Sequence, residues 1–151
     1  FVTLSVIKLV KKTGYPGMKI LQFAFDSREE SDYLPHNYLA NSVVYTGTHD
    51  NDTTMGWYKN VSRRDRSFAK KYLNIRGNKD VVWNFIRAAI ASVSDTAIIP
   101  MQDYLGLGSE ARINVPSTLG NNWKWRMVPG QLNKELADKI YTMCKLYGRI
   151  R

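Results

Sequence analysis

The sequence contains only one cysteine, Cys144, so no disulfide bond can form within the chain. This excludes the disulfide-rich frameworks on which small secreted domains depend. The thiol lies in an apolar pattern at 141–146, where helix packing explains it better than a role as a nucleophile. The chain also lacks an apolar run long enough to span a membrane, because the apolar stretch at 1–10 is too short. We therefore expect a cytoplasmic protein with no membrane partner.

Metal-binding and phosphate-binding motifs are lacking as well. No cluster of His, Cys, Asp and Glu has the spacing of a metal site. Gly106, Gly108 and Gly120 do not form a phosphate-binding loop, because no Gly-Lys-Ser or Gly-Lys-Thr sequence follows them. We predict that the protein needs no cofactor and binds no metal.

Acidic residues are scarce: 13 Asp and Glu stand against 22 Lys and Arg, and the formal net charge is +9. Such a charge raises nucleic-acid binding as one function class. The basic residues are scattered, however, and the densest group, at 63–71, fits the solvated face of a helix. No helix-turn-helix, zinc-finger or RNA-binding motif accompanies them, so we predict no nucleic-acid partner.

The apolar residues alternate between strand and helix patterns. Strands are predicted at 18–25, 42–47 and 96–101, and helices at 63–73, 80–92 and 131–147, with a short helix from Asp52 or Thr53 to Lys59. Val6, Ile7, Leu9 and Val10 indicate the buried face of one more helix. Strands joined by helical crossovers form parallel sheets, so the chain is predicted to be an α/β protein.

The most informative segment is 43–54, where an apolar run ends at the polar residues His49-Asp50-Asn51-Asp52. The run is typical of a strand that is covered on both faces. In parallel sheets, functional residues gather at the carboxyl ends of such strands. A loop that only caps the next helix, with Asp52 or Thr53 as the N-cap, explains the same residues. From this segment alone both interpretations stay open.

Several ordered motifs extend beyond this segment. In chain order they are GMKILQFAF at 17–25, YLPHNY at 33–38, YTGTHDNDT at 45–53, QDYLGLGSEAR at 102–112, GNNWKWR at 120–126 and LYGR at 146–149. Together they resemble the C-terminal part of 4-α-glucanotransferases of the amylomaltase and plant disproportionating enzyme family. Long motifs in the family's order are far more specific than a single short one.

The resemblance implies that residues 1–151 are the C-terminal portion of a single catalytic (β/α)8 TIM barrel, with about its last three strands and no separate domain boundary. A complete barrel needs roughly 250 residues, whereas this chain has 151. We therefore expect the missing N-terminal part of the barrel as a partner. The chain is expected to begin just past a loop that carries one of the catalytic acids.

The resemblance also assigns site residues. Cleavage of an α-1,4-glucosidic bond with retention needs a nucleophilic carboxylate, a general acid/base and stabilisation of an oxocarbenium-like transition state. Asp50 matches the family's third carboxylate, which stabilises that transition state, and His49 is its neighbour in the same sugar subsite. Phe23 is expected to contact substrate, and Asn122 matches a substrate-binding Asn, with Asn121 as the register alternative.

Other candidates have simpler interpretations. Asp26, Glu29, Glu30 and Asp32 are predicted to be surface charges, because the resemblance places the nucleophile and the acid/base upstream. Asp103 is predicted to organise the loop after its strand, and Glu110 to pair with Arg112. Trp57 is expected in the core. Trp123 and Trp125 should point the same way if that segment is extended.

The function implied by the resemblance is transfer of α-1,4-glucan segments between maltodextrins through a covalent glycosyl-enzyme intermediate. Starch-derived or glycogen-derived α-1,4-glucans are the expected partners. Because two catalytic carboxylates are not expected within these 151 residues, the alternative for the chain alone is a non-catalytic glucan-binding or structural fragment.

Overall fold

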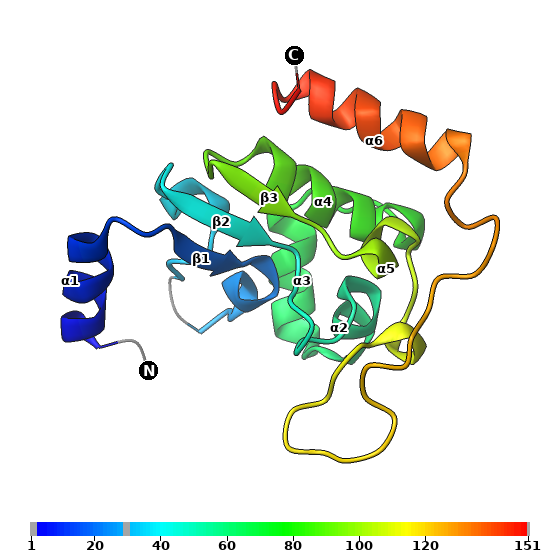
Figure 1. Cartoon of the computed structure of the whole chain (residues 1–151), viewed down its shortest axis with the longest axis horizontal. Coiled ribbons are helices and arrows are strands. Elements are labelled where there is room, and N and C mark those ends of the chain that lie inside the picture. The colour runs from blue at the N-terminus through cyan, green and yellow to red at the C-terminus, as the bar shows by residue number, and fades with distance from the viewer. Residues whose placement is uncertain (1–2, 29–30, 151) are drawn as a thin grey trace.

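The computed structural model describes residues 3–28 and 31–150 and contains a three-stranded parallel sheet in the order β1-β2-β3. The strands are β1 (Gly17–Ile20), β2 (Ser42–Tyr45) and β3 (Thr96–Ile98). Their pairing is parallel throughout, so the carboxyl ends of all three strands lie at one edge of the sheet (Figure 1). The predicted α/β class and parallel sheet are confirmed.

The first strand is shorter than the predicted strand at 18–25, because the chain turns into a 3-10 helix, η1 (Leu21–Phe25). A 3-10 helix places side chains three residues apart on one side. Leu21 and Ala24 are both fully buried, whereas Phe23 remains 49 % exposed. An extended strand would direct Leu21 and Ala24 to opposite faces, so the burial of both favours the helical turn.

The longer helices lie where the apolar periodicity predicts them. The helices are α1 (Leu4–Thr13), α2 (Thr54–Asn60), α3 (Arg63–Tyr72), α4 (Val81–Ala91), α5 (Met101–Tyr104) and α6 (Lys134–Leu146), with 3-10 helices η2 (Pro35–Asn37), η3 (Asn78–Asp80) and η4 (Ser109–Ala111). Thr53 is the N-cap of α2, since its side chain accepts from Gly56 N–H. Asn133 caps α6, which therefore begins at Lys134 instead of residue 131. The strand predicted to reach residue 101 ends at Ile98, and α5 follows Pro100.

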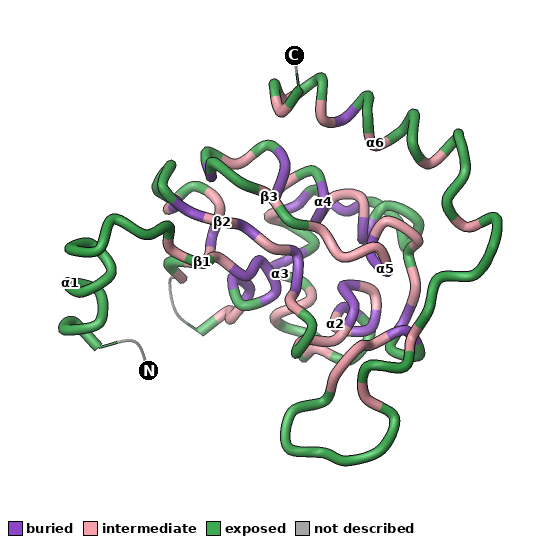
Figure 2. Tube along the Cα trace, viewed as in Figure 1, coloured by how far each residue is buried: buried purple, intermediate pink, exposed green. Residues whose placement is uncertain are grey.

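The main core lies between the sheet and helices α2, α3 and α4 (Figures 1 and 2). The predicted apolar face of α4 is buried: Val81, Val82, Phe85, Ile86 and Ile90 lie in this core, and Ala89 packs with Tyr38 and Val44 in a second cluster. Phe25 joins the elements, because its ring centroid lies 5.3 Å from that of Phe85 and 5.9 Å from that of Trp57. The prediction that Trp57 belongs to the core is confirmed.

The opposite face of the sheet is largely uncovered in the described structure. Met18 is 57 % exposed and Ile98 is 46 % exposed, whereas Val44, which points to the helices, is fully buried. The prediction that β2 is covered on both faces is met only in part within the described residues, because Val43 and Tyr45 are half-buried on this face. Coverage of the second face needs another layer of structure, and the described helices pack on the Val44 side or lie at the periphery (Figure 1).

Helix α1 corrects a second expectation. Its apolar residues were predicted to form a buried face, but none of the residues of α1 is buried, and Leu9 is 60 % exposed. The helix projects away from the sheet (Figure 1), so the described residues give its apolar face no packing partner. Within the described parts of the chain, no helix has the length and apolar character needed to cross a membrane.

Candidate functional site

The loop after β2, 46–53, carries the polar segment and forms a compact turn. Asn51 Oδ1 accepts hydrogen bonds from the backbone N–H (2.9 Å) and the hydroxyl (2.8 Å) of Thr48. The Asn51 N–H in turn donates to the Thr48 carbonyl at 3.1 Å. The side chains of His49 and Asp50 remain 54 % and 48 % exposed on this loop.

Asp50 is held by residues from the segment that follows β3. Asn114 Nδ2 donates to Asp50 Oδ1 at 2.7 Å, and Arg112 Nη2 donates to the Asp50 backbone carbonyl at 2.7 Å. His49 Nε2 lies 3.4 Å from the same Oδ1. Within the described residues Oδ2 has no hydrogen-bond partner, so this oxygen can accept from a ligand.

His49 also contacts an aromatic ring from the long loop, 113–123. The ring centroids of His49 and Trp123 lie 5.1 Å apart, with an interplanar angle of 37°. The backbone N–H of Trp123 donates to the Ile113 carbonyl at 2.7 Å, and this bond closes the two ends of the loop 113–123. Trp123 is 57 % exposed, which leaves much of its ring accessible beside His49.

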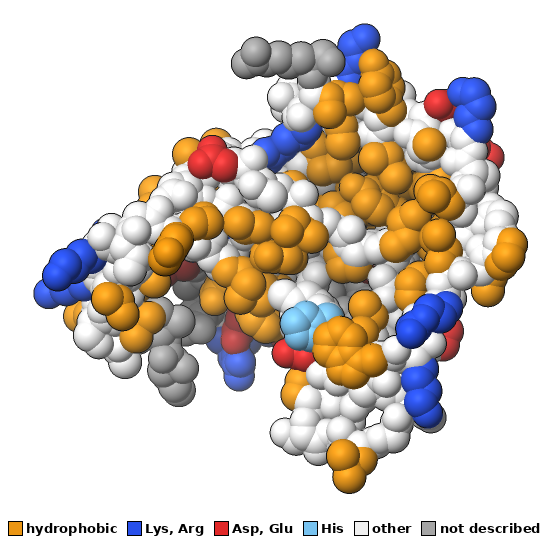
Figure 3. Space-filling model, viewed as in Figure 1, with side chains coloured by type: hydrophobic (Ala, Val, Ile, Leu, Met, Phe, Trp, Pro, Cys, Tyr) orange, Lys and Arg blue, Asp and Glu red, His pale blue; other side chains and the backbone are white. Residues whose placement is uncertain are grey.

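His49 and Asp50 border an open groove of about 630 Å³ over the uncovered face of the sheet. Its apolar wall is formed by Met18, Ile20, Phe23, Tyr45, Ile98, Pro100, Met101 and Ile113, and its polar rim by Thr48, His49, Asp50, Asn51 and Gln102. Hydrophobic side chains form a broad area on this face of the molecule (Figure 3). An apolar wall with a few convergent polar groups is typical of a ligand site.

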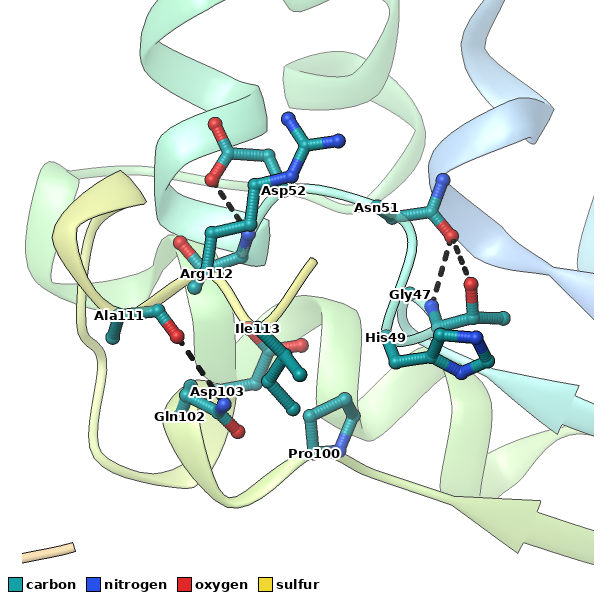
Figure 4. A pocket seen from close by; sticks show the side chains of 12 residues that line it. Gly47, His49, Asn51, Asp52, Pro100, Gln102, Asp103, Ala111, Arg112 and Ile113 are labelled. Atoms are coloured by element: carbon teal, nitrogen blue, oxygen red, sulfur yellow. Dashed lines mark hydrogen bonds between the residues drawn. The ribbon is translucent and has the colours of Figure 1, made fainter. Parts of the chain in front are cut away.

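A smaller pocket of about 30 Å³ lies between the loop after β2 and the segment after β3 (Figure 4). Gln102 lines it and donates to the Ala111 carbonyl at 3.3 Å. Such a volume suits a water molecule and cannot admit a sugar ring. A ligand of sugar size therefore fits the groove, not this pocket.

Phe23 lies in the groove together with His49 and Asp50, as the sequence-based assignment requires. It belongs to η1 and not to the end of a strand. Its ring packs edge-to-face against Tyr33, with centroids 5.7 Å apart and an interplanar angle of 83°. This contact fixes the orientation of the ring while half of the side chain stays exposed.

Asn122 is not brought to Asp50. Its Oδ1 accepts from Val115 N–H at 3.0 Å, and its Nδ2 donates to the carbonyl and the hydroxyl of Thr118, so the side chain closes the long loop on itself. The register alternative, Asn121, accepts from Lys124. The amide that contacts Asp50 is Asn114, which the sequence analysis missed. The only signal available for it was its place two residues after the 102–112 motif.

The predicted pair of Glu110 and Arg112 does not form. Glu110 Oε1 accepts from the Gly108 N–H at 2.8 Å, and backbone hydrogen bonds of this kind lower the pKa of Glu110. The Arg112 guanidinium is directed to backbone carbonyls, those of Asn114 at 2.9 Å and Asp50 at 2.7 Å. Arg112 therefore stabilises the loop after β2 instead of neutralising a carboxylate.

Two of the remaining carboxylates are surface groups, as predicted. Hydrogen bonds from Arg28 lower the pKa of Asp26 to about 2. Asp32 is exposed, and its backbone carbonyl accepts from Lys19. Glu29 and Glu30 lie outside the described residues. The condition under which Trp123 and Trp125 would point the same way, an extended segment at 123–125, is not met, because Trp123 has a φ of +64°.

Asp103 is the one carboxylate that is almost fully buried among the described residues, at 1 % exposure. It lies in α5, and its Oδ2 accepts from the hydroxyls of Thr46 (2.5 Å) and Thr54 (2.7 Å) while Oδ1 accepts from Thr54 N–H (2.8 Å). Burial raises the pKa of Asp103, against the lowering effect of these hydrogen bonds. Through them it organises the loop after β2, not the loop after its own strand as predicted.

Comparisons with known proteins match the chain to one family. A family model described as 4-alpha-glucanotransferase matches residues 1–132. The chain is 47 % identical over 150 residues to a 4-alpha-glucanotransferase of Clostridium butyricum, which covers 99 % of this chain and 31 % of the relative. It is also 47 % identical over 152 residues to a chloroplastic/amyloplastic 4-alpha-glucanotransferase of Arabidopsis thaliana. This match covers 99 % of this chain and 26 % of the relative.

A solved structure matches the fold of the whole chain. The amylomaltase from Streptococcus agalactiae in complex with acarbose superposes with a TM-score of 0.95 at 34 % identity, over 100 % of this chain and 31 % of that chain. The chain thus spans between a quarter and a third of the length of these relatives.

Proposed function

Because the chain belongs to the 4-alpha-glucanotransferase family, we propose that its protein transfers α-1,4-glucan segments from a donor maltodextrin to an acceptor. The observation that carries this proposal is the position of the Asp50 carboxylate. It follows the carboxyl end of a parallel strand, is held by Asn114, and borders a groove with an apolar wall. Enzymes built on parallel sheets bind their substrates at this end of the strands.

The proposed reaction consists of two displacements at C1 of the transferred sugar, with net retention. In the first, an enzyme carboxylate bonds to C1 while the glycosidic bond breaks and a carboxylic acid protonates the leaving oxygen. In the second, a hydroxyl of the acceptor attacks C1, gives its proton to the same carboxyl group and displaces the enzyme carboxylate. Positive charge develops on the sugar in both transition states, and a nearby carboxylate stabilises it.

We assign this stabilising carboxylate to Asp50. Asn114 fixes Oδ1 at 2.7 Å, which leaves Oδ2 to accept hydrogen bonds from the hydroxyls of the sugar next to the scissile bond. Such hydrogen bonds strengthen as the ring flattens toward the transition state. His49 lies beside this carboxylate, and an imidazole N–H can donate to a neighbouring sugar hydroxyl.

The apolar faces of the glucan are assigned to the aromatic rings of the site. The C–H face of a pyranose stacks on aromatic side chains, and Phe23 and Trp123 are 49 % and 57 % exposed. We transfer the role that the sequence gave to Asn122 to Asn114, because Asn114 is the amide that contacts Asp50. Asn122 then supports the long loop.

The nucleophile and the acid/base are not assigned within this chain. Among the described residues that line the groove, Asp50 is the only carboxylate, and the buried Asp103 is engaged with Thr46 and Thr54. We place both groups in polypeptide outside the 151 residues. We also place the three strands in the C-terminal part of a (β/α)8 barrel, whose other strands would cover the open sheet face. The likeness to 31 % of an amylomaltase supports this placement.

The test uses the polypeptide encoded by the whole reading frame, incubated with maltotriose and analysed by chromatography. We expect glucose together with maltodextrins longer than maltotriose, and the 151-residue chain alone is expected to form neither. Products limited to glucose and maltose would identify a hydrolase instead. Binding of maltodextrins by the whole polypeptide without any product would favour the non-catalytic glucan-binding alternative.

A further inference from the structure

We propose that Asp103 is the positioning residue for Asp50, because its buried carboxylate holds both ends of the loop that carries Asp50. This inference rests on the proposed function for its catalytic consequence. The structural part, a carboxylate that clamps the loop, stands on the hydrogen bonds alone.

The two ends of the loop meet at one carboxylate. Thr46 directly follows β2, and Thr54 is the first residue of α2. The Thr46 hydroxyl donates to Asp103 Oδ2 at 2.5 Å, while the hydroxyl and the N–H of Thr54 donate at 2.7 and 2.8 Å. The residues between these anchors, 47–53, include both His49 and Asp50, so one group sets where the loop leaves the sheet and where it returns.

All donors to this carboxylate are uncharged. Among the described residues Asp103 makes no salt bridge, and it is 1 % exposed. A buried carboxylate without a cation costs free energy, but its charge strengthens each hydrogen bond that it accepts. Its two oxygens can take all three bonds at once. An amide has only one acceptor oxygen, so Asn at this position would keep the volume and lose part of the clamp.

Other contacts prevent the loop from tilting between the two anchors. Gln22 Nε2 donates to the Asp52 carbonyl at 2.9 Å, and the Ser109 hydroxyl donates to Asp52 Oδ2 at 2.7 Å. Gly47 permits the first contact, because a Cβ at that position would lie 2.5 Å from Gln22 Nε2. With both ends and one side fixed, the position of Asp50 over the groove follows from the backbone.

The chain offers a matched control at the opposite end of β2. The hydroxyls of Ser42 and Ser94 form a hydrogen bond of 2.7 Å, and both residues are 1 % exposed. This pair is buried and joins β2 to the segment before β3, as the Asp103 clamp joins β2 to the segment after β3. Ser42, however, lies at the amino end of the strand, remote from the loop.

The experiment compares Asp103→Asn with Ser42→Ala in the whole polypeptide. Hydrogen exchange measures protection of the backbone amides of 48–54, and kinetics separate kcat from KM on maltotriose. For Asp103→Asn we expect faster exchange in this segment, a fall in kcat of about tenfold or more, and a KM within about threefold of the parent. For Ser42→Ala we expect a lower melting temperature, with no change in exchange at 48–54, in kcat or in KM.

Thr54→Val and Thr54→Ser provide a second test that does not depend on the folding of the Asp103 variant. Val removes the hydroxyl that donates to Asp103, whereas Ser retains it. We therefore expect a lower kcat in Thr54→Val and a kcat close to that of the parent in Thr54→Ser. The proposal would be overturned if Asp103→Asn left exchange at 48–54 unchanged. It would also be overturned if Asp103→Asn and Ser42→Ala lost the same kcat per folded molecule. An inactive parent polypeptide would refute the proposed function, while the exchange comparison would still decide the clamp.

Discussion

Asn114 donates a hydrogen bond of 2.7 Å to the carboxylate of Asp50, although 64 residues separate the two in the chain. The contact joins the segment after β3 to the loop after β2. It fixes one oxygen of a half-exposed carboxylate and leaves the other without a hydrogen bond among the described residues. Under the proposed function, a carboxylate held in this way is preorganised to face the charge that develops in the transition state.

Asp50→Asn is expected to lower kcat of the whole polypeptide on maltotriose by several orders of magnitude, with much less change in maltodextrin binding. The reason is that the lost interaction belongs mainly to the transition state. Because the side chain is 48 % exposed, the melting temperature should stay close to that of the parent. Steady-state kinetics, calorimetric binding and thermal melts measure the three quantities. A near-normal kcat with a collapsed melting temperature would restore the loop-capping interpretation.

Asn114→Ala and Asn122→Ala should differ. A hydrogen bond to a charged group contributes about 1.5 to 3 kcal/mol, so losing the Asn114 donor is expected to reduce kcat about tenfold to a hundredfold. Asn122 only closes the loop onto Val115 and Thr118, so its removal should loosen the loop with a smaller effect on kcat. Kinetic measurements on both variants decide the matter. A larger loss in Asn122→Ala would return the substrate-binding role to that residue.

Gly47→Ala is expected to destabilise the fold by about 1–3 kcal/mol, because the added methyl overlaps Gln22, which cannot retreat without releasing Asp52. Gly17 is the matched control. A Cβ at Gly17 would have nothing within 4 Å, so Gly17→Ala should leave stability nearly unchanged. Urea unfolding of both variants measures the difference. Equal stability of the two would show that Gln22 does not require this close approach.

The raised pKa of Asp103 predicts a pH dependence of stability. A carboxyl group whose pKa is higher in the folded state than its unfolded value of about 3.9 favours folding most below that value, and this contribution is lost as pH rises through the folded pKa. Relative to Asp103→Asn, the parent should therefore be more stable at acidic pH than at neutral pH. Unfolding free energies of both proteins across this range give the difference. A relative stability of the parent that rises with pH would contradict the burial effect.

The open sheet predicts the behaviour of the 151-residue chain on its own. β1 and β3 each have one unpaired edge within the described sheet, and the exposed Met18 and Ile98 lie on its uncovered face. Such edges and faces favour association. We expect concentration-dependent oligomers or dye binding, reversed when the part of the Clostridium butyricum relative that this chain does not match is supplied in trans. Sedimentation as a compact monomer with sharp unfolding would count against a partial barrel.

The fold was predictable wherever burial has a simple period. The apolar face of α4 and the parallel order of the strands follow from patterns that local sequence carries. The shared site of Phe23, His49 and Asp50 was expected from the family resemblance, not from spacing, and the three residues line one groove. These predictions needed no knowledge of how the loops close.

The remaining parts depend on tertiary contacts that no spacing encodes. The Asn114 N–H donates to the His49 carbonyl at 3.1 Å, which places Asn114 beside Asp50, whereas Asn122 closes the long loop onto Val115 and Thr118. The turn into η1 results from burial of Leu21 and Ala24 together. The apolar residues of α1 predict a buried face, but none of them is buried among the described residues, which supply no surface to pack against it.

The hydrogen bonds to Asp103 also restrict the length of the loop after β2. Since Thr46 and Thr54 both bind one carboxylate, an insertion or deletion between them would pull at least one threonine from its partner. The loop 113–123 is closed at its neck by a backbone hydrogen bond and points outward, with Leu119 fully exposed, so it can lengthen or shorten without that strain. Length variation among relatives should therefore fall in the long loop and spare the short one, and donor preference can diverge while the position of Asp50 stays constant.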